Sequence, residues 1–325
     1  HWPLHAWPED IARYEGKYLK GWDFLRTSRH EELKGLGILD SKWAISKRDE
    51  SSSPWDDIPH HEWQAWRMAV YAAQVDRMDQ NIGRLRAHLE KLGIAGNTLV
   101  VFLSDNGGCA EFLSEDGHKG RELPFTRDGR PVRCGNIPGL MPGDADTFMS
   151  YDLPWANASN SPFRLFKHWV HEGGISTPLI AWWPERIAPR RMTHEIGHVM
   201  DIMPTFLELA GVSYPDKFNG RGVAPVDGES LAPLFQDRKW SRRRPVFFEH
   251  EGNCAVRDGQ WKLVRRFPGP WELYDMENDR TETNDLSGKN PGKAAEMAAA
   301  YESWAPQANV LPWEQLQQHR RARAR

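Results

Sequence analysis

The sequence has few cysteines, no long apolar run and almost no net charge, and each of these features excludes a class of protein. Its three cysteines, at irregular spacing, form neither a disulfide framework nor a cysteine-type zinc site. No apolar run approaches the roughly 20 residues that a membrane-spanning helix needs. The 42 basic and 45 acidic residues leave a formal charge of −3, so the overall positive field of a nucleic-acid-binding protein is absent.

Familiar catalytic signatures are missing as well. The chain contains no P-loop, no Gly-x-Gly-x-x-Gly and no His-Glu-x-x-His motif. No Gly-x-Ser-x-Gly elbow surrounds Ser104, although a carboxylate follows it directly. Cys109, Cys134 and Cys254 stand in no recognisable catalytic setting. The residues themselves therefore indicate no nucleophile.

What the sequence does contain is enough length and apolar material for about two domains. Apolar residues make up 39% of its 325 residues before glycine is counted, which is ordinary for a globular protein. We predict an α/β domain over residues 1–235 and a small α+β subdomain with a basic tail over residues 236–325.

The most regular pattern is a helix over residues 62–92, whose apolar side chains repeat at spacings of three and four. We expect this stripe to pack on a sheet. The continuous apolar run 98–103 predicts a strand buried on both faces, as in a parallel sheet. This strand ends in the polar residues Ser104, Asp105 and Asn106, and α/β folds bind ligands at such strand ends.

Other segments carry weaker patterns. Residues 8–18 and 21–36 resemble short helices, and Ser161-Pro162 is a good start for a helix over 161–170. The basic end at 320–325 reads as a frayed, solvated terminus. The remaining expected elements are a strand at 177–184, a helix at 198–210, strands at 245–249, 255–257, 260–264 and 271–274, and a helix at 290–304.

Residues 109–160 form a long polar segment that is rich in glycine and proline. Such a loop is usually functional or disordered, and its aromatic residues argue against disorder. We expect it to lie over a site, with lid contacts at 136–139 and 151–160. A peripheral loop packed by its aromatic side chains is the alternative.

Four residues could carry chemistry. Asp105 and Asn106 offer hard oxygen ligands for Ca²⁺ or Mg²⁺, although the same residues also form ordinary turns. Lys167 could hold an oxyanion as a point charge, or could simply lie along the surface. His1 could bond a substrate oxygen or donate a proton, although a lone histidine is more often structural.

Taken in order, these segments resemble type I sulfatases of the arylsulfatase branch. The resemblance covers nearly the whole chain. It rests on residues 1–6 (HWPLHA), the helix and strand that end in SDNGG at 104–108, SPFRLFK at 161–167, EGGISTPLI at 172–180, DIMPT and LELAG between 201 and 211, QWKL at 260–263 and WELYD at 271–275.

The resemblance implies an alkaline-phosphatase-like (sulfatase) α/β fold, with a mixed sheet flanked by helices and a small C-terminal antiparallel sheet plus helix. It implies a sulfuric ester hydrolase that releases inorganic sulfate from an aryl or carbohydrate ester. Asp105 and Asn106 would ligate Ca²⁺, with Mg²⁺ less favoured, and Lys167 and His1 would contact the sulfate. A cation, a lysine and a histidine around this group would stabilise its developing charge. Family habit implies a periplasmic or secreted protein.

The chain departs from the family pattern in two respects. Sulfatases make a formylglycine nucleophile from Cys or Ser in a Cys/Ser-x-Pro/Ala-x-Arg motif, and none of the three cysteines here fits it. The family's N-terminal pair of aspartate metal ligands also has no counterpart. Because the chain opens at His1 within a motif, we expect it to be the C-terminal part of a sulfatase, inactive alone, whose formylglycine lies in a preceding segment.

Two alternatives remain open at this level. One is a phosphonate or phosphate ester hydrolase of the same superfamily, in which the oxyanion site holds phosphorus. The other is a non-catalytic glycan-binding remnant, for which 16 tryptophans offer stacking surfaces. The expected partner is the ester substrate, with no nucleic acid and no membrane span. The sequence leaves the oligomeric state undecided.

Overall fold

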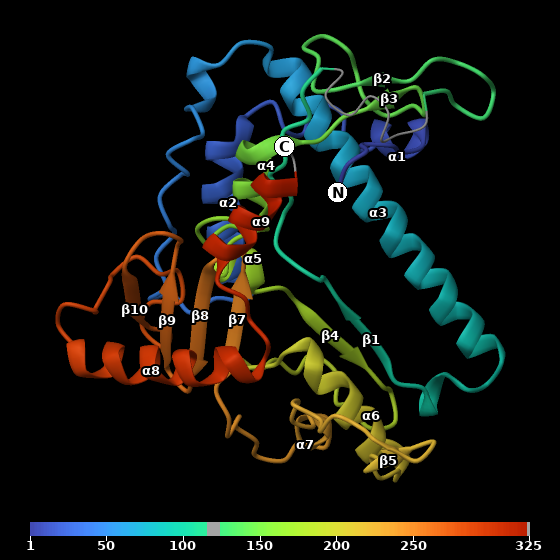
Figure 1. The fold of residues 1–325 in the computed structure, drawn as a ribbon. Helices are drawn as coiled ribbons and strands as arrows, with labels where there is room; N and C mark the ends of the chain where they lie inside the picture. Colours follow the sequence, from blue (N-terminus) through green and yellow to red (C-terminus); the bar gives the residue numbers. More distant parts are fainter. Residues whose placement is uncertain (116–123, 324–325) are drawn as a thin grey trace.

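The computed structural model describes residues 1–115 and 124–323, and it is a mixed α/β molecule (Figure 1). A helical N-terminal region packs against the first half of the long helix α3 (His61–Lys91), whose second half projects away from it. A two-stranded sheet lies in the middle, and a four-stranded antiparallel sheet lies near the C-terminus. No helix among these residues is long and apolar enough to cross a membrane.

Aromatic packing holds the N-terminal region together. Helices α1 (Pro8–Ala12) and α2 (Gly21–Gly35) form near their predicted positions. The ring of Trp22 makes edge-on contacts with Trp55 and Trp155 at centroid distances of 4.8 and 5.3 Å. Edge-to-face geometry places the positive edge of one ring on the negative face of another, which is a favourable arrangement.

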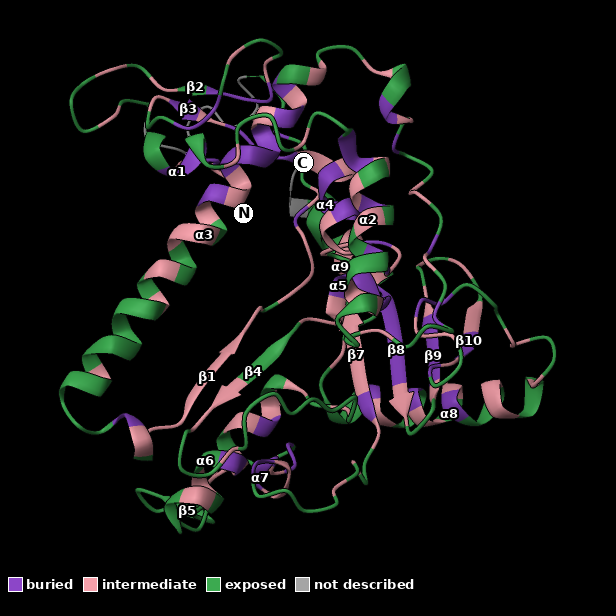
Figure 2. Cartoon of the chain, turned by 180° about the vertical axis from the view of Figure 1, so that it is seen from behind, coloured by how far each residue is buried: buried purple, intermediate pink, exposed green. Residues whose placement is uncertain are grey.

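Helix α3 forms as predicted, but its expected packing on a sheet is wrong. The first half is buried, whereas Val75, Met78 and Leu85 are 43%, 42% and 53% exposed. Figure 2 shows this change from buried to exposed along the helix. Nothing among the described residues covers the second half of the apolar stripe.

The strand after α3 also differs from expectation. Strand β1 (Val100–Leu103) pairs antiparallel with β4 (Leu179–Trp182), and in the described chain the two form a sheet of their own. The predicted strand buried on both faces of a parallel sheet is therefore wrong. The apolar run is only half-buried, because a two-stranded sheet leaves its faces uncovered; Ile180 of β4 is 57% exposed.

Part of the segment expected to lie over the site belongs instead to the hydrophobic core. Helix α4 (Asp152–Ser159) occupies most of residues 151–160, and its Trp155 side chain is fully buried. Asn136 is also buried and bonds to Ser150. The lid contacts predicted at 151–160 are wrong because these aromatic residues join the hydrophobic core. The part of the segment at 116–123 lies outside the described residues.

The helix predicted over 161–170 does not form. Leu165 and His168 adopt φ angles of 65° and 98°, which interrupt any right-handed helix. The segment instead folds back so that the Gly173 amide donates to the carbonyl of Arg164 at 3.0 Å. Only the short helix α5 (Glu172–Ile175) follows.

The elements after β4 largely confirm expectation. Helix α6 (Ile202–Ala210) ends at Gly211, whose φ of 66° closes it in the left-handed conformation. Smaller elements are η1 (Trp55–Asp57), η2 (Ala95–Asn97), β2 (Arg133–Cys134), β3 (Thr147–Phe148), η3 (Val199–Asp201), β5 (Lys217–Phe218), β6 (Arg221–Gly222) and α7 (Ala232–Phe235).

The C-terminal sheet is confirmed, in the strand order β10-β9-β8-β7. Its strands are β7 (Val246–His250), β8 (Asn253–Asp258), β9 (Trp261–Arg265) and β10 (Trp271–Asp275). Helix α8 (Pro291–Gln307) packs on it, with Trp304 stacked on Phe247 at 4.9 Å.

The basic end predicted at 320–325 is exposed at 320–322 as expected, but it is not frayed where the structure describes it, because residues Trp313–Arg323 form helix α9. Residues 324–325 lie outside the described residues. Arg320 of α9 lies over the ring of Trp313, 4.9 Å from the centroid, and pairs with Glu251 of the β7–β8 turn at 3.6 Å. A cation–π contact and an ion pair thus give this basic segment partners other than solvent.

Candidate active site

Three segments that are distant in sequence meet at the candidate site: the first residues, the end of β1 and the turn around residue 167. The meeting depends on two glycines. A Cβ atom on Gly107 would lie 1.8 Å from the carbonyl oxygen of Gly173, and one on Gly108 would lie 2.4 Å from the Tyr151 hydroxyl. Only glycine allows this approach. The Lys167 amide then donates to the Gly108 carbonyl at 3.0 Å.

Two residues with predicted sulfate contacts lie side by side. The Nε2 atom of His1 is 3.2 Å from Nζ of Lys167. The Nδ1 atom of His1 lies 2.6 Å from the Trp2 carbonyl, which can only accept a hydrogen bond. The proton of a neutral His1 ring is therefore on Nδ1, and Nε2 presents a lone pair to the lysine ammonium.

The predicted metal ligands are connected to this pair through the backbone. Asp105 and Asn106 follow strand β1 and directly precede Gly107 and Gly108, and the Gly108 carbonyl accepts from the Lys167 amide at 3.0 Å. Asp105 is exposed, and Asn106 is half-buried. The Asn106 side-chain amide donates to the Gly107 carbonyl at 2.9 Å, which leaves its oxygen as an acceptor.

The chemistry of these donors fits part of a calcium site. A carboxylate and an amide oxygen are the hard ligands that Ca²⁺ prefers, but the ion takes six to eight of them. Within residues 1–115 and 124–323, Asp105 joins no cluster of three or more carboxylate, imidazole or thiol groups. Asp105 and Asn106 can therefore supply some of the ligands, and others have to complete the shell.

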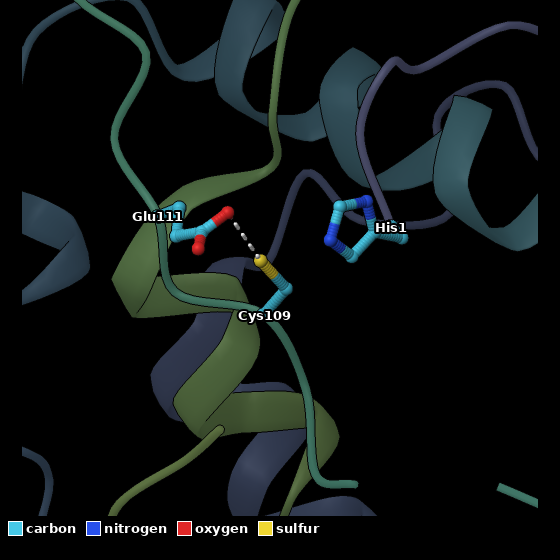
Figure 3. Close-up of side chains that lie close together, drawn as sticks. All are labelled: His1, Cys109 and Glu111. Carbon is cyan, nitrogen blue, oxygen red and sulfur yellow. Dashed lines mark hydrogen bonds between the residues drawn. The ribbon is translucent and has the colours of Figure 1, made fainter. Parts of the chain in front are cut away.

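Two further residues at the site have no signal in the sequence spacing. Cys109 is 5% exposed, and its Sγ lies 3.4 Å from Oε2 of Glu111 (Figure 3). The same carboxylate oxygen accepts from the indole of Trp2. Burial raises the pKa of the Cys109 thiol. Spacing in the sequence does not predict that His1, Cys109 and Glu111 lie close together, because His1 is far from the other two along the chain.

A buried network of ion pairs fixes helix α5, against which Gly107 packs. Lys262 of β9 is fully buried, and its Nζ lies 2.8 Å from Glu172 and 2.7 Å from Glu282. Arg280 adds a contact to Glu172 at 3.0 Å. Burial alone would raise the pKa of Glu172, but Lys262 and Arg280 hold it well below its usual range. Because Glu172 begins α5, the network fixes the backbone against which Gly107 packs.

A second network lies beside it. Glu272 of β10 contacts Arg164 at 3.1 Å, Tyr274 at 2.5 Å and His171 at 3.6 Å. Burial raises the pKa of Glu272, but the neighbouring His171, the hydrogen bond from Tyr274 and the charge of Arg164 lower it to about 2. These contacts connect the C-terminal sheet to the turn that carries Lys167.

Comparisons with known proteins agree with the sequence resemblance. A model of the Sulfatase family matches residues 1–212, and a model described as N-sulphoglucosamine sulphohydrolase, C-terminal, matches residues 163–302. The chain is 34% identical over 301 residues to an uncharacterized sulfatase of Schizosaccharomyces pombe, covering 90% of this chain and 53% of that protein. It is 30% identical to an arylsulfatase of Klebsiella aerogenes, covering 75% of this chain and 51% of that protein.

The chain therefore spans about half the length of these curated relatives. Among solved structures, Ps i-CgsB aligns with a TM-score of 0.57 and 22% identity, covering 94% of this chain and 48% of that one. The same protein has been solved in complex with k-i-k-neocarrahexaose. At this identity the likeness shows the fold.

Proposed function

Because this chain belongs to the sulfatase family and has its alkaline-phosphatase-like fold, we propose that it supplies the sulfate-binding side of a sulfuric ester hydrolase. The observation that carries the proposal is the 3.2 Å contact between His1 Nε2 and Lys167 Nζ, with the Lys167 amide bonded to Gly108, two residues after the Asp105-Asn106 pair.

The chemistry follows from these groups. Hydrolysis of a sulfate ester moves negative charge onto the leaving oxygen, and fixed positive charge near that position lowers the barrier. Lys167 offers a full charge and three donors to the sulfate oxygens. His1 can donate to the ester from Nε2 once that atom carries a proton. A Ca²⁺ ion held in part by Asp105 and Asn106 would add positive charge at the sulfate.

We place the nucleophile outside these 325 residues. Two observations support this: no cysteine of the chain stands in a Cys-x-Pro/Ala-x-Arg motif, and the curated relatives are about twice as long as the part that matches. The expected group is a formylglycine, accompanied by the remaining calcium ligands. On this proposal the 325 residues alone bind sulfate esters without turning them over.

The substrate class is an aryl or a carbohydrate sulfate ester. One similar protein is named an arylsulfatase, and the matched C-terminal model carries the name of an enzyme for N-sulphoglucosamine. The Ps i-CgsB complex contains a neocarrahexaose. These names support both an aryl and a carbohydrate sulfate ester, and the experiment below distinguishes the two substrates.

The test uses the complete gene product with Ca²⁺ and measures inorganic sulfate released from an aryl sulfate and from sulfated oligosaccharides, beside phosphate or phosphonate released from matched esters. We expect sulfate release, and a fall of about 100-fold or more in kcat/KM for Lys167→Ala, the size seen when one oxyanion donor is lost. Lys289→Ala, at an exposed lysine of the C-terminal subdomain, is the control. Faster phosphonate than sulfate turnover, or a Lys167→Ala variant as active as the control, would refute the proposal.

A further inference from the structure

Three donor atoms of different chemical types converge beside the candidate active site. They belong to His1, Cys109 and Glu111, and one ligand atom from each lies within 4.8 Å of the other two. In Figure 3 the carboxylate and the imidazole both face the sulfur of Cys109. Nitrogen, sulfur and oxygen together are the donor set of zinc-like ions, whereas the oxygens of Asp105 and Asn106 suit calcium.

The histidine is already in the form that binds a metal. Its Nδ1 proton is directed at the Trp2 carbonyl, 2.6 Å away, so the lone pair is on Nε2. Metal-binding histidines in proteins commonly have this arrangement, in which a carbonyl on the second nitrogen fixes the tautomer and the ring orientation. Without a metal, the Nε2 lone pair accepts from the ammonium of Lys167.

The spacing of the other two donors also suits a small ion. A tetrahedral zinc with bonds of about 2.3 Å to sulfur and about 2.0–2.2 Å to oxygen places those two atoms about 3.5 Å apart. The observed Sγ–Oε2 distance is 3.4 Å. The carboxylate is held in place by the indole of Trp2, so this edge of the tetrahedron is formed before any ion arrives.

We propose that His1, Cys109 and Glu111 form a binding site for a zinc-like transition-metal ion, separate from the calcium ligands. Coordination replaces the thiol proton, which leaves to solvent, and the hydrogen bond from sulfur to Glu111 gives way to one metal–sulfur and one metal–oxygen bond. Three protein ligands leave the fourth position of a tetrahedral ion for water.

The site has a consequence for catalysis that rests on the proposed function. A metal on Nε2 of His1 takes the lone pair from Lys167 and withdraws the imidazole from the sulfate ester. Zinc therefore inhibits the hydrolase, and removal of zinc by a chelator that spares calcium restores activity. The binding site itself is tested without any activity measurement.

The binding test is a Co²⁺ titration of the protein in excess Ca²⁺, followed by absorption. We expect a thiolate-to-cobalt charge-transfer band that saturates at one ion per chain and disappears when Zn²⁺ is added, since zinc binds such sites more tightly. The band reports only sulfur ligands, so ions at Asp105 or at the separate His168, His250 and Glu251 cluster do not contribute to it.

Matched variants locate the sulfur. Cys109→Ser should abolish the band, whereas Cys134→Ser and Cys254→Ser, which alter the other two buried free cysteines, should keep it. Glu111→Gln retains the thiol and should weaken Co²⁺ binding by about tenfold or more, the size of effect seen when metal-site partners are removed. Thermal melting shows that each variant is folded.

Two results would overturn the metal site: no thiolate band in the folded wild-type protein, or equal loss of the band in Cys109→Ser and Cys134→Ser. If Cys109→Ser does not fold, the Glu111→Gln titration decides, because an unchanged affinity contradicts the site. These outcomes are independent of sulfate release. A protein that hydrolyses sulfate esters but shows no band disproves only the metal site, and the reverse result disproves only the hydrolase.

Discussion

Lys262 gives the sharpest test of how the fold supports the site. Its ammonium is fully buried between two carboxylates, 2.8 Å from Glu172 and 2.7 Å from Glu282. Lys262→Met keeps most of the side-chain volume and removes the charge, so two buried carboxylates lose a shared partner. Breaking a buried ion pair by removing one partner costs about 3–5 kcal/mol.

That cost is a large share of the 5–15 kcal/mol that typically separates folded from unfolded protein. We expect urea unfolding, followed by tryptophan fluorescence, to show a loss of about 4 kcal/mol and a midpoint of thermal unfolding on the order of 10 °C lower. The effect should also reach the site. Amide exchange at Gly107, which donates to Gly174 at 2.9 Å, should become faster because Glu172 no longer fixes α5.

Lys293→Met is the matched control. Lys293 of α8 is half-buried and lies 2.8 Å from the exposed Glu296 and 3.9 Å from Asp258, and pairs open to solvent on one side contribute about 1 kcal/mol or less. Adding Glu282→Gln to Lys262→Met should recover part of the loss, because it removes one of the unpaired charges. If Lys262→Met costs no more than Lys293→Met, the buried network does not stabilise the fold as argued.

Two further predictions concern neighbouring positions. Glu272 has its folded pKa lowered from 4.5 to about 2, so it contributes stability above pH about 4.5 that is lost as the pH falls toward 2. Because the group is partly open to solvent, screening reduces this contribution to about 2 kcal/mol or less. Glu272→Gln should flatten the free energy of unfolding across that window, and an unchanged slope between pH 5 and 2 would contradict the pairing. Gly107→Ala should lower the thermal midpoint, because its Cβ would meet the Gly173 carbonyl at 1.8 Å. Gly288→Ala, with open space around it, should leave the midpoint unchanged; equal melting of the two variants would refute the clash.

Elements governed by neighbours in sequence could be predicted. Helix α3 has the periodicity of a helix, and the hairpin between β8 and β9 follows from Asp258-Gly259, where Gly259 takes a φ of 52°. Helix α6 likewise ends at its glycine. In each case the signal lies within a few residues of the element, so no knowledge of the tertiary structure is needed.

The misjudged elements depend on distant residues. The segment 161–170 has apolar residues at helical spacing, yet hydrogen bonds from Gly173 to Arg164 and from Lys167 to Gly108 fold it into a turn. Helix α4 resembles a loop in the sequence because its eight residues contain a proline and a single large aromatic side chain, Trp155, and so show no helical periodicity. For β1, the composition of the run indicated burial, which the two-stranded sheet of the described chain does not provide.

At the candidate site, too, local sequence predicts the individual residues but not their tertiary arrangement. Asp105, Asn106, Lys167 and His1 were singled out one at a time from local sequence and the family resemblance. Their proximity could not be derived from spacing, because it arises from the packing of two glycine pairs, 107–108 and 173–174. For the same reason, local sequence gives no signal for the Glu111 carboxylate at the site or for the buried charge of Lys262 within strand β9.

We propose that Asp105 and Asn106 hold calcium against a sulfate ester that His1 and Lys167 contact. The test is sulfate release by the complete gene product, measured as a function of free Ca²⁺. We predict activity that saturates with Ca²⁺ in the wild type, and an Asp105→Ala variant that needs about tenfold more Ca²⁺ or more, or is inactive. Sulfate release that persists after calcium is chelated and is unaffected by Asp105→Ala would contradict the assignment.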